Sequence, residues 1–514
     1  FRHILVDEFQ DTNAIQYAWI RVLAGNTANV MIVGDDDQSI YGWRGAQIEN
    51  LHRFLKDFSG ATTIRLEQNY RSTANILNAS NAVIANNPDR LGKELWTEDK
   101  DGEPISVYCA FNEMDEAKFI VGRISDWHEK GGSLSECAIL YRSNAQSRVL
   151  EEAFLHKGLA YRIYGGLRFF ERQEIKDAMG YMRLINNQND DAAFERVVNT
   201  PARGIGDRTL DIIRSTARQH ELTLWQACVS LIEEKVLAGR AANAINGFME
   251  LIIAMRTDTA DMLLYRMADD VIDRSGLRTM YEAEKGEKAQ ARIENLNELV
   301  TAARSFEMPE ELEDMGELNA FLSHAALEAG EGQADAFTDA VQLMTLHSAK
   351  GLEFPMVFMA GVEEGLFPSK MALDEGDRLD EERRLCYVGM TRAMQKLYIS
   401  YAESRRIYGR EDYASPSRFI NEIPEKFVEQ IRIRAQVKPS VSQRFPAKAT
   451  VATKKPHGFN DTGHKVGSKV KHFKFGEGVV TSFEGSGEKG RVQVEFVDFG
   501  SKWLLVSLAK LERC

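Results

Sequence analysis

The chain opens with "ILVDEFQDT" at residues 4–12, which indicates the fold of its first part. Three apolar residues lead directly into two adjacent carboxylates, Asp7 and Glu8. A helix-like segment, "AIQYAWIRVLAG" (14–25), and a second apolar run, "VMIVGD" (30–35), follow it. This alternation of strand, helix and strand predicts an α/β sheet, with the two carboxylates at the end of a buried strand.

The same alternation returns later in the chain. Strand-like runs occupy 104–110, 137–143, 341–348, 355–361 and 395–402, and helices are expected over 114–130 and 146–157. Between them, 165–338 has an almost wholly helical pattern, as in "ARIENLNELV", where Ile293, Leu296 and Val300 fall on one face. The pattern therefore predicts a helical block inserted into an α/β domain.

The end of the chain changes in character. Residues 431–463 hold seven Lys or Arg against one acid and lack periodicity, which is typical of a flexible linker. Short strand-like runs separated by glycines follow over 464–514 and predict a small β-barrel. The acidic stretch 307–318 is expected to be a solvated loop.

Composition bounds the class of protein. A chain of 514 residues exceeds one hydrophobic core and predicts several domains. No apolar run approaches the roughly 18 residues of a membrane span, so no membrane partner is expected. Five cysteines without a CxxC pair predict neither a zinc site nor a disulfide framework, and favour a reducing cytosol. The net charge of −13 averages over very unlike regions, so it does not exclude nucleic acid.

The paired carboxylates suit phosphate chemistry. In nucleotidases with a phosphate-binding loop, an Asp at the end of a hydrophobic strand holds Mg²⁺. We assign that role to Asp7, and Glu8 is then placed to deprotonate the attacking water. The alternative is a strand end that carries two solvated acids.

A second motif, "VGDDDQSIYGWRGA" (33–46), combines an uncharged donor with two aromatic residues. Gln38 suits contact with a γ-phosphate or the attacking water. Tyr41 and Trp43 lie beside Arg44, and exposed aromatics next to Arg suit base stacking by single-stranded nucleic acid. The alternative is a core Trp followed by a turn.

Three further motifs carry polar residues at the ends of expected elements. In "LEQNYRST" (66–73), Tyr70 suits stacking on adenine and Arg71 suits a phosphate; an ordinary helix start is the alternative. In "LMTLHSAKGLEFPMVF" (343–358), the polar residues are expected to bind a sugar–phosphate backbone from a helix N-terminus, and Glu353 to accept from a ribose hydroxyl. The three backbone-binding candidates in that motif are Thr345, His347 and Ser348. In "YVGMTRAMQKL" (387–397), a helix is expected to present Arg392 as an arginine finger, with a surface salt bridge as the alternative.

Together, these five stretches in this order resemble motifs II to VI of the superfamily 1A DNA helicases, the UvrD/Rep/PcrA group, over about residues 1–430. The resemblance implies Asp7 for Mg²⁺ and Glu8 as catalytic base. It implies that the γ-phosphate is sensed by Gln38, Arg71 and Arg392, that Tyr70 stacks on adenine, and that Glu353 holds the ribose. It also implies single-stranded DNA contacts by Tyr41, Trp43 and His347, with Arg142 and Asn144 of "YRSNAQSR" as weaker candidates.

The family fold implies a domain plan. Two RecA-like lobes would clamp ATP: the end of the first lobe at 1–66, and the second lobe at 67–164 and 339–430. A helical insertion, 2B, would occupy 165–338, with the linker at 431–463 and a Tudor- or SH3-like barrel at 464–514. In the insertion, Gly204 and Gly206 of "TPARGIGDRTL" would offer backbone amides to duplex phosphates, although a Gly turn with an Asp207 cap would look the same.

One family element has no counterpart in the sequence. No G-x-x-x-x-G-K-[ST] occurs, and "GSGEKG" (485–490) lacks the required spacing. Since the chain begins at Phe1 rather than Met, we expect its N-terminal part, with the phosphate-binding loop, to lie upstream. The chain as given is expected to bind ATP poorly and not to unwind DNA, whereas its parent protein does both.

The resemblance implies an ATP-dependent 3′–5′ DNA helicase or translocase in nucleotide excision and mismatch repair, in the bacterial cytosol at the nucleoid. Its cofactors would be ATP and Mg²⁺. Its partners would be single-stranded DNA, single-strand/duplex junctions, repair proteins and, through the barrel, RNA polymerase. One alternative is a helicase–nuclease subunit, disfavoured because no acidic metal-site triplet follows residue 430. The other is a non-catalytic remnant that binds DNA or a partner, disfavoured by the presence of Glu8, Gln38, Arg71 and Arg392.

Overall fold

The computed structural model places most of the chain. It describes residues 1–25, 27–88, 90–237, 239–284, 286–308, 315–330, 338–374, 376–407, 410–432, 468–472, 475–484, 491–496, 500–505 and 511–513. The chain divides into two units, Phe1–Ala435 and Gln436–Cys514, which are described separately below. Nearly all of the expected linker and half of the expected acidic loop, as well as "GSGEKG", lie outside the described residues.

The first elements form a small α/β layer. Strands β1 (His3–Val6) and β2 (Asn29–Ile32) are parallel, with Ile4 opposite Val30. Helix α1 (Ala14–Ala24) connects them, and α2 (Glu49–Asp57) follows. A reciprocal capping box between Asn13 and Gln16 begins α1. The expected strand–helix–strand order is confirmed, and β1 ends immediately before Asp7, but the expectation of a buried strand is wrong because the side chains of β1 are exposed or half-buried.

A seven-stranded sheet forms the centre of the first unit, and all its pairings are parallel. Its strand order is β11-β3-β8-β7-β4-β6-β5. The strands are β3 (Ile105–Ala110), β4 (Cys137–Tyr141), β5 (Tyr161–Ile163), β6 (Val341–Thr345), β7 (Phe354–Met359), β8 (Ala393–Ala402) and β11 (Val428–Arg432). The expected strands are confirmed, each within a few residues.

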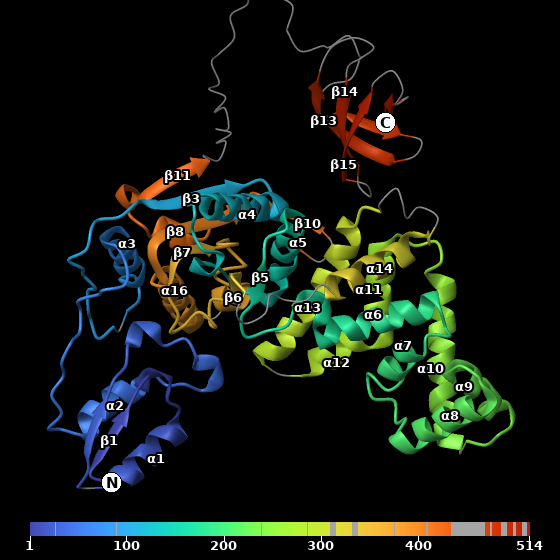
Figure 1. The fold of residues 1–514 in the computed structure, drawn as a ribbon, viewed down its shortest axis with the longest axis horizontal. Helices are drawn as coiled ribbons and strands as arrows, with labels where there is room; N and C mark the ends of the chain where they lie inside the picture. The colour runs from blue at the N-terminus through green and yellow to red at the C-terminus, as the bar shows by residue number, and fades with distance from the viewer. Residues whose placement is uncertain are drawn as a thin grey trace, which may run out of the picture. The chain divides into compact units, whose positions relative to one another are not determined.

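Helices cover both faces of this sheet (Figure 1). Helices α3 (Ala74–Ile84) and α16 (Gly376–Met390) pack on one face, and α4 (Glu113–Glu129) and α5 (Ser147–Lys157) on the other. Along β4 the side chains alternate: Ala138 and Leu140 join the first core, and Cys137, Ile139 and Tyr141 the second. A strand buried on both faces explains the continuous apolar run in the sequence.

A helical block lies in the chain between β5 and β6, which are neighbours in the sheet. Its helices are α6 (Gln173–Asn186), α7 (Asp191–Val197), α8 (Asp207–His220), α9 (Leu224–Glu233), α10 (Gly239–Asp258), α11 (Leu264–Ser275), α12 (Leu277–Ala283), α13 (Glu287–Ser305) and α14 (Glu317–Gly330). They share one core, to which Leu296 and Val300 of α13 contribute buried side chains and Ile293 a partly buried one. The predicted apolar face of this helix is therefore confirmed.

The remaining elements of the first unit follow β7 and β8. They are α15 (Lys370–Asp374), β9 (Ser404–Ile407), β10 (Arg410–Tyr413) and α17 (Arg418–Asn421). A buried ion cluster joins them to the sheet layer: Arg405 of β9 lies 2.6 Å from both Glu116 of α4 and Glu363. Two carboxylates around one guanidinium are each neutralised only while Arg405 is present.

The second unit is a five-stranded antiparallel sheet in the order β15-β14-β13-β12-β16. The strands are β12 (Lys469–His472), β13 (Gly476–Glu484), β14 (Arg491–Phe496), β15 (Gly500–Leu505) and β16 (Glu512–Arg513). Val470, Val480, Val492, Val494 and Phe496 form its core.

Across the residues that the structure describes, no helix combines the length and the apolar character that a membrane span requires.

Candidate functional site at the two edges of the large sheet

The predicted site residues of the second half gather at opposite edges of one sheet. The segments after the carboxyl ends of β4 and β6 carry Arg142, Asn144, His347 and Ser348. By contrast, Glu353 directly precedes β7, and Arg392 directly precedes β8. Since all strands are parallel, the candidate DNA residues lie at the carboxyl edge and these candidate nucleotide residues at the amino edge.

Glu8, the candidate base, has a strained backbone. Its φ of 49° and ψ of 42° are left-handed, a conformation that costs a non-glycine residue roughly 1–3 kcal/mol. The Glu8 amide donates to Asp7 Oδ1 at 2.9 Å, and Gln10 Nε2 donates to Glu8 Oε2 at 2.7 Å. Both Asp7 and Glu8 are exposed, so their carboxylates open to the solvent in front of β1.

Lys350, in the motif at 343–358, connects this acidic turn to Gln38 of the motif at 33–46. It is not among the residues predicted from the sequence. Its Nζ lies 2.6 Å from Asp11 Oδ2 and 3.1 Å from Glu8 Oε2, and donates to the carbonyl oxygen of Gln38 at 2.9 Å. Burial raises the pKa of Asp11, and the bond from Lys350 opposes that rise. Lys350 is the Lys of "HSAKGLEF", so the sequence signal was its place inside the motif.

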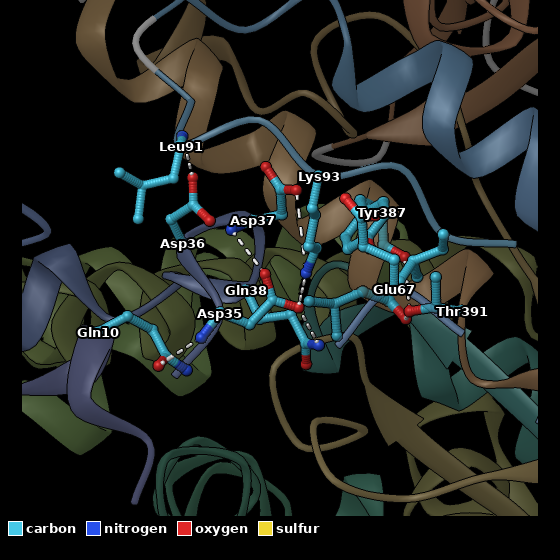
Figure 2. A network of polar contacts seen from close by, with 12 residues as sticks. Gln10, Asp35, Asp36, Asp37, Gln38, Glu67, Leu91, Lys93, Tyr387 and Thr391 are labelled. Atoms are coloured by element: carbon cyan, nitrogen blue, oxygen red, sulfur yellow. Dashed lines mark hydrogen bonds and ion pairs between the residues drawn. The ribbon is translucent and has the colours of Figure 1, made fainter. Parts of the chain in front are cut away.

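Gln38 ends the short turn η2 (Asp36–Gln38), and its side chain is held by an acid (Figure 2). Its Nε2 donates to Asp35 Oδ2 at 2.7 Å, and Lys93 forms an ion pair with the same oxygen. The amide of Asp35 donates in turn to Gln10 Oε1 at 3.0 Å. The Gln38 amide therefore lies in a network that begins at the turn of the candidate base.

The three adjacent acids of this network lie close enough to hold a cation, with carboxylate oxygens within 4.8 Å of one another. Each already has a partner. Asp37 takes a bidentate pair of bonds from Arg90 at 2.7 Å, and Asp36 accepts from the Leu91 amide at 2.7 Å. With Asp35 bonded to Lys93, these acids bind the segment after α3 rather than a metal ion.

Two of the nucleotide candidates contact each other. Arg71 Nε donates to Glu353 Oε2, although the two residues are 282 positions apart in the chain. Beside them, Tyr70 is 84% exposed and its hydroxyl donates to Gln68. An exposed tyrosine ring next to an arginine is available to stack on a flat ligand.

Arg392 is buried, with 2% of its surface exposed, so the alternative of a surface salt bridge is wrong. It lies in the short connection after α16, rather than within that helix, and donates to the carbonyl oxygens of Val388 at 3.0 Å and Leu352 at 3.2 Å. Burial lowers the pKa of Arg392 to about 10, with a further contribution from the charge of Arg71.

At the carboxyl edge, three rings from two distant segments form one group. Tyr41, Trp43 and His347 have ring centroids 6.3–6.4 Å apart. The Arg44 guanidinium lies 4.5 Å from the Trp43 ring centre, and the Tyr41 hydroxyl donates to the carbonyl oxygen of His347 at 3.3 Å. Burial lowers the pKa of His347 to about 3, as do the charges of Arg142 and Arg44. The three rings therefore lie together, as expected, and the lowered pKa favours a neutral His347 imidazole.

The segment after β6 corrects one prediction. Residues 346–351 form turns, so the helix N-terminus expected there is wrong. The turn is closed by side chains instead: Thr345 Oγ1 accepts from the Ser348 amide at 3.2 Å and lies 2.9 Å from Ser348 Oγ. The short crossing from β6 to β7, residues 346–353, leaves too few residues for a helix, since Glu353 must already reach the amino edge.

The weaker DNA candidates have protein partners. Arg142 pairs with Glu382 of α16 at 2.8 Å, which neutralises its charge, and the Asn144 carbonyl oxygen accepts from Arg172. In the helical block, Gly206 is the N-cap of α8 and Asp207 its first residue, so the Asp207 cap is wrong. Gly204 has a φ of 78°, and nothing lies within 4 Å of where a Cβ would be at Gly204 or Gly206. These glycines leave their backbone open to a ligand.

The acidic turn fits a magnesium ion by its chemistry. Asp7 and Glu8 are exposed oxygen donors, the type that Mg²⁺ prefers. Within the described residues, Asp11 Oδ1 is buried without a hydrogen-bond partner. The donor set therefore suits a hard cation with bound water in front of β1.

Comparison with known proteins places this geometry in a family. The family model for the UvrD-like helicase C-terminal domain matches residues 64–404, that for the UvrD/REP helicase N-terminal domain matches 1–59, and that for the PcrA/UvrD tudor domain matches 466–513. DNA helicase II of Escherichia coli is 67% identical over 512 residues, and that of Haemophilus influenzae is 60% identical over 513; each comparison covers all of this chain and 70% of the relative. The ATP-dependent DNA helicase PcrA of Bacillus subtilis is 41% identical, with 71% of its length covered.

The α/β fold with a large parallel sheet, the Tudor-like C-terminal unit and these relatives agree. The chain belongs to the UvrD-like DNA helicases.

Proposed function

We propose that this chain is the motor part of an ATP-dependent 3′–5′ DNA helicase or translocase. The observation that carries the proposal is Lys350, which lies on the segment joining the two edges of the large sheet. This one side chain bonds the candidate base, its neighbour Asp11 and the backbone of Gln38. Residues for hydrolysis and residues for DNA are thereby connected through a single turn.

In this proposal, the acidic turn carries out hydrolysis. Asp7 holds Mg²⁺, which when bound would neutralise charge on the phosphates. Glu8 accepts the proton of the attacking water, and its strained backbone holds the carboxylate toward solvent in front of β1. Gln38 exchanges its bond to Asp35 for one to the γ-phosphate or that water.

The second half of the chain supplies the opposing cations. Arg71 and Arg392 stabilise the charge that develops on the γ-phosphate, Glu353 accepts from the ribose, and Tyr70 stacks on adenine. Within the described residues, Arg392 donates to carbonyl oxygens and to the Thr391 hydroxyl rather than to a carboxylate, so its charge is available to a phosphate. Burial strengthens this interaction because the local dielectric is low.

The carboxyl edge binds single-stranded DNA. Tyr41 and Trp43 offer ring faces to successive bases, with the neutral His347 beside them. Thr345 and Ser348 hold the turn that carries His347, and their hydroxyls are suited to the sugar–phosphate backbone. In the helical block, Gly204 and Gly206 offer amides to duplex phosphates.

We also propose the domain plan set out above: RecA-like lobes at 1–66 and at 67–164 with 339–430, the 2B insertion at 165–338, the linker at 431–463 and the Tudor-like unit at 464–514. A segment outside this chain would supply the phosphate-binding loop, since the sequence contains no such motif. Action in nucleotide excision and mismatch repair, contact with repair proteins or RNA polymerase through the Tudor-like unit, and a place in the bacterial cytosol are part of the same proposal.

The test is DNA-stimulated ATP hydrolysis by the full-length protein. Glu8→Gln is expected to lower kcat by at least 100-fold and to leave the affinity for single-stranded DNA within about twofold. Glu98→Gln, an exposed acid, is the matched control and is expected to have no effect. Unchanged hydrolysis in Glu8→Gln would overturn the assignment of the base.

A further inference from the structure

The loop that carries the aromatic group is held by an acid from a distant helix. This aromatic loop, residues 41–44, contains the short turn η3 (Gly42–Arg44). Tyr41, the residue that precedes this turn, makes no side-chain hydrogen bond that caps it. Instead, the Gly42 amide donates to Glu381 Oε1 of α16 at 2.9 Å. A backbone group that would otherwise need water is thus satisfied by a side chain 339 residues further along.

The fit between loop and acid is tight. A Cβ at residue 42 would lie 2.6 Å from Glu381 Oε2 and 3.2 Å from its carboxyl carbon. Gly42 does not have a positive φ, so its lack of a side chain is explained by this close approach rather than by its backbone. A side chain at this position would therefore have to displace the Glu381 carboxylate from the loop.

Glu381 is poorly placed to bind DNA itself. It is partly buried, and a carboxylate repels phosphates. Burial raises the pKa of Glu381, and the bond from the Gly42 amide opposes that rise. The neighbouring Glu382 is already paired with Arg142. The contribution of Glu381 to DNA binding must therefore act through the loop.

Helix α16 runs between the two sheet edges. Glu381 lies in its first half, near the carboxyl edge, and the helix ends at Met390, roughly 14 Å further along. Arg392 follows at the amino edge, just before β8. The helix that contacts the aromatic loop therefore leads, two residues after its end, to the arginine proposed to sense the nucleotide.

We propose that Glu381 is a positioning residue for single-stranded DNA binding: through the Gly42 amide it holds Tyr41 and Trp43 in the orientation in which they stack on bases. This inference rests on the proposed DNA function. The acceptor oxygen, rather than the charge, is the working part, because the donor is a neutral backbone amide.

The experiment measures binding of this chain to oligo-dT that contains 2-aminopurine, whose fluorescence is quenched when the base stacks. Glu381→Ala is expected to weaken binding about tenfold and to relieve much of the quenching in the bound state. Glu381→Gln keeps an acceptor oxygen and is expected to bind and quench like the wild type. Glu282→Ala, an exposed helical acid of α12, is the matched control.

A double-mutant cycle separates positioning from general damage. Gly42→Ala is expected to reproduce the Glu381→Ala defect, because its methyl group displaces the carboxylate. The double variant should be no weaker than either single variant. Binding by Glu381→Ala within twofold of wild type with full quenching, or defects that multiply in the double variant, would overturn the inference. Failure of the wild-type chain to bind oligo-dT would instead overturn the proposed DNA function, and this inference with it.

Discussion

His347 illustrates how burial changes the chemistry of a residue. It lies beside the rings of Tyr41 and Trp43, and both its burial and the charges of Arg142 and Arg44 disfavour a protonated imidazole. In the proposed DNA site, a neutral ring would contact DNA by packing and hydrogen bonding, not by charge. The motif alone could not reveal this, because the surroundings of His347 come from residues some two to three hundred positions away.

The pKa of His347, about 3, predicts its behaviour with pH. Because the folded-state pKa is below the ordinary value of about 6.5, the unfolded chain binds a proton first as the pH falls. The stability contributed by neutral His347 is therefore present above pH 6.5 and is lost between about 6.5 and 3. An NMR titration should show no change in the His347 ring resonances between pH 5.5 and 8. A step near pH 6.5 would contradict the buried environment.

At the scale of elements, the buried ion cluster tests how β9 is attached to the sheet layer. Arg405→Ala leaves Glu116 and Glu363 without their cation, so the free energy of unfolding is expected to fall by about 3–5 kcal/mol. Arg123→Ala is the control, because its pair with Asp126 is exposed and is expected to contribute less than about 0.5 kcal/mol. Urea unfolding measures both. A loss below about 1 kcal/mol in Arg405→Ala would show that the cluster does not hold β9.

The sequence predicted the strands and helices well where a single hydrophobic pattern was sufficient to locate them. Apolar runs located the strands of the parallel sheet because both faces are covered, and periodicity located α13 because one face is buried. It failed at 346–351, where the motif predicts a helix start but the chain must cross from one sheet edge to the other. Lys350 and Glu381 were missed for a different reason: their partners are 312 to 342 residues away, and no local pattern encodes such contacts.

At the scale of the first unit, the arrangement separates two kinds of chemistry across one sheet. Glu353 and Arg392, proposed for the nucleotide, lie at its amino edge, residues proposed for DNA lie at its carboxyl edge, and two segments connect the edges. One is the crossing that carries Lys350, and the other is α16 with Glu381 and the following Arg392. A shift of either segment on nucleotide binding would displace the aromatic loop. A motor requires such a link between its nucleotide site and its DNA site.

The most direct test of this account is ATP-dependent strand separation by the full-length protein. On duplexes with a 3′ or a 5′ single-stranded tail, we predict unwinding of the 3′-tailed duplex alone, and its loss in Glu8→Gln with binding to the tail retained. Unwinding that persists in Glu8→Gln, or that prefers the 5′ tail, would contradict it.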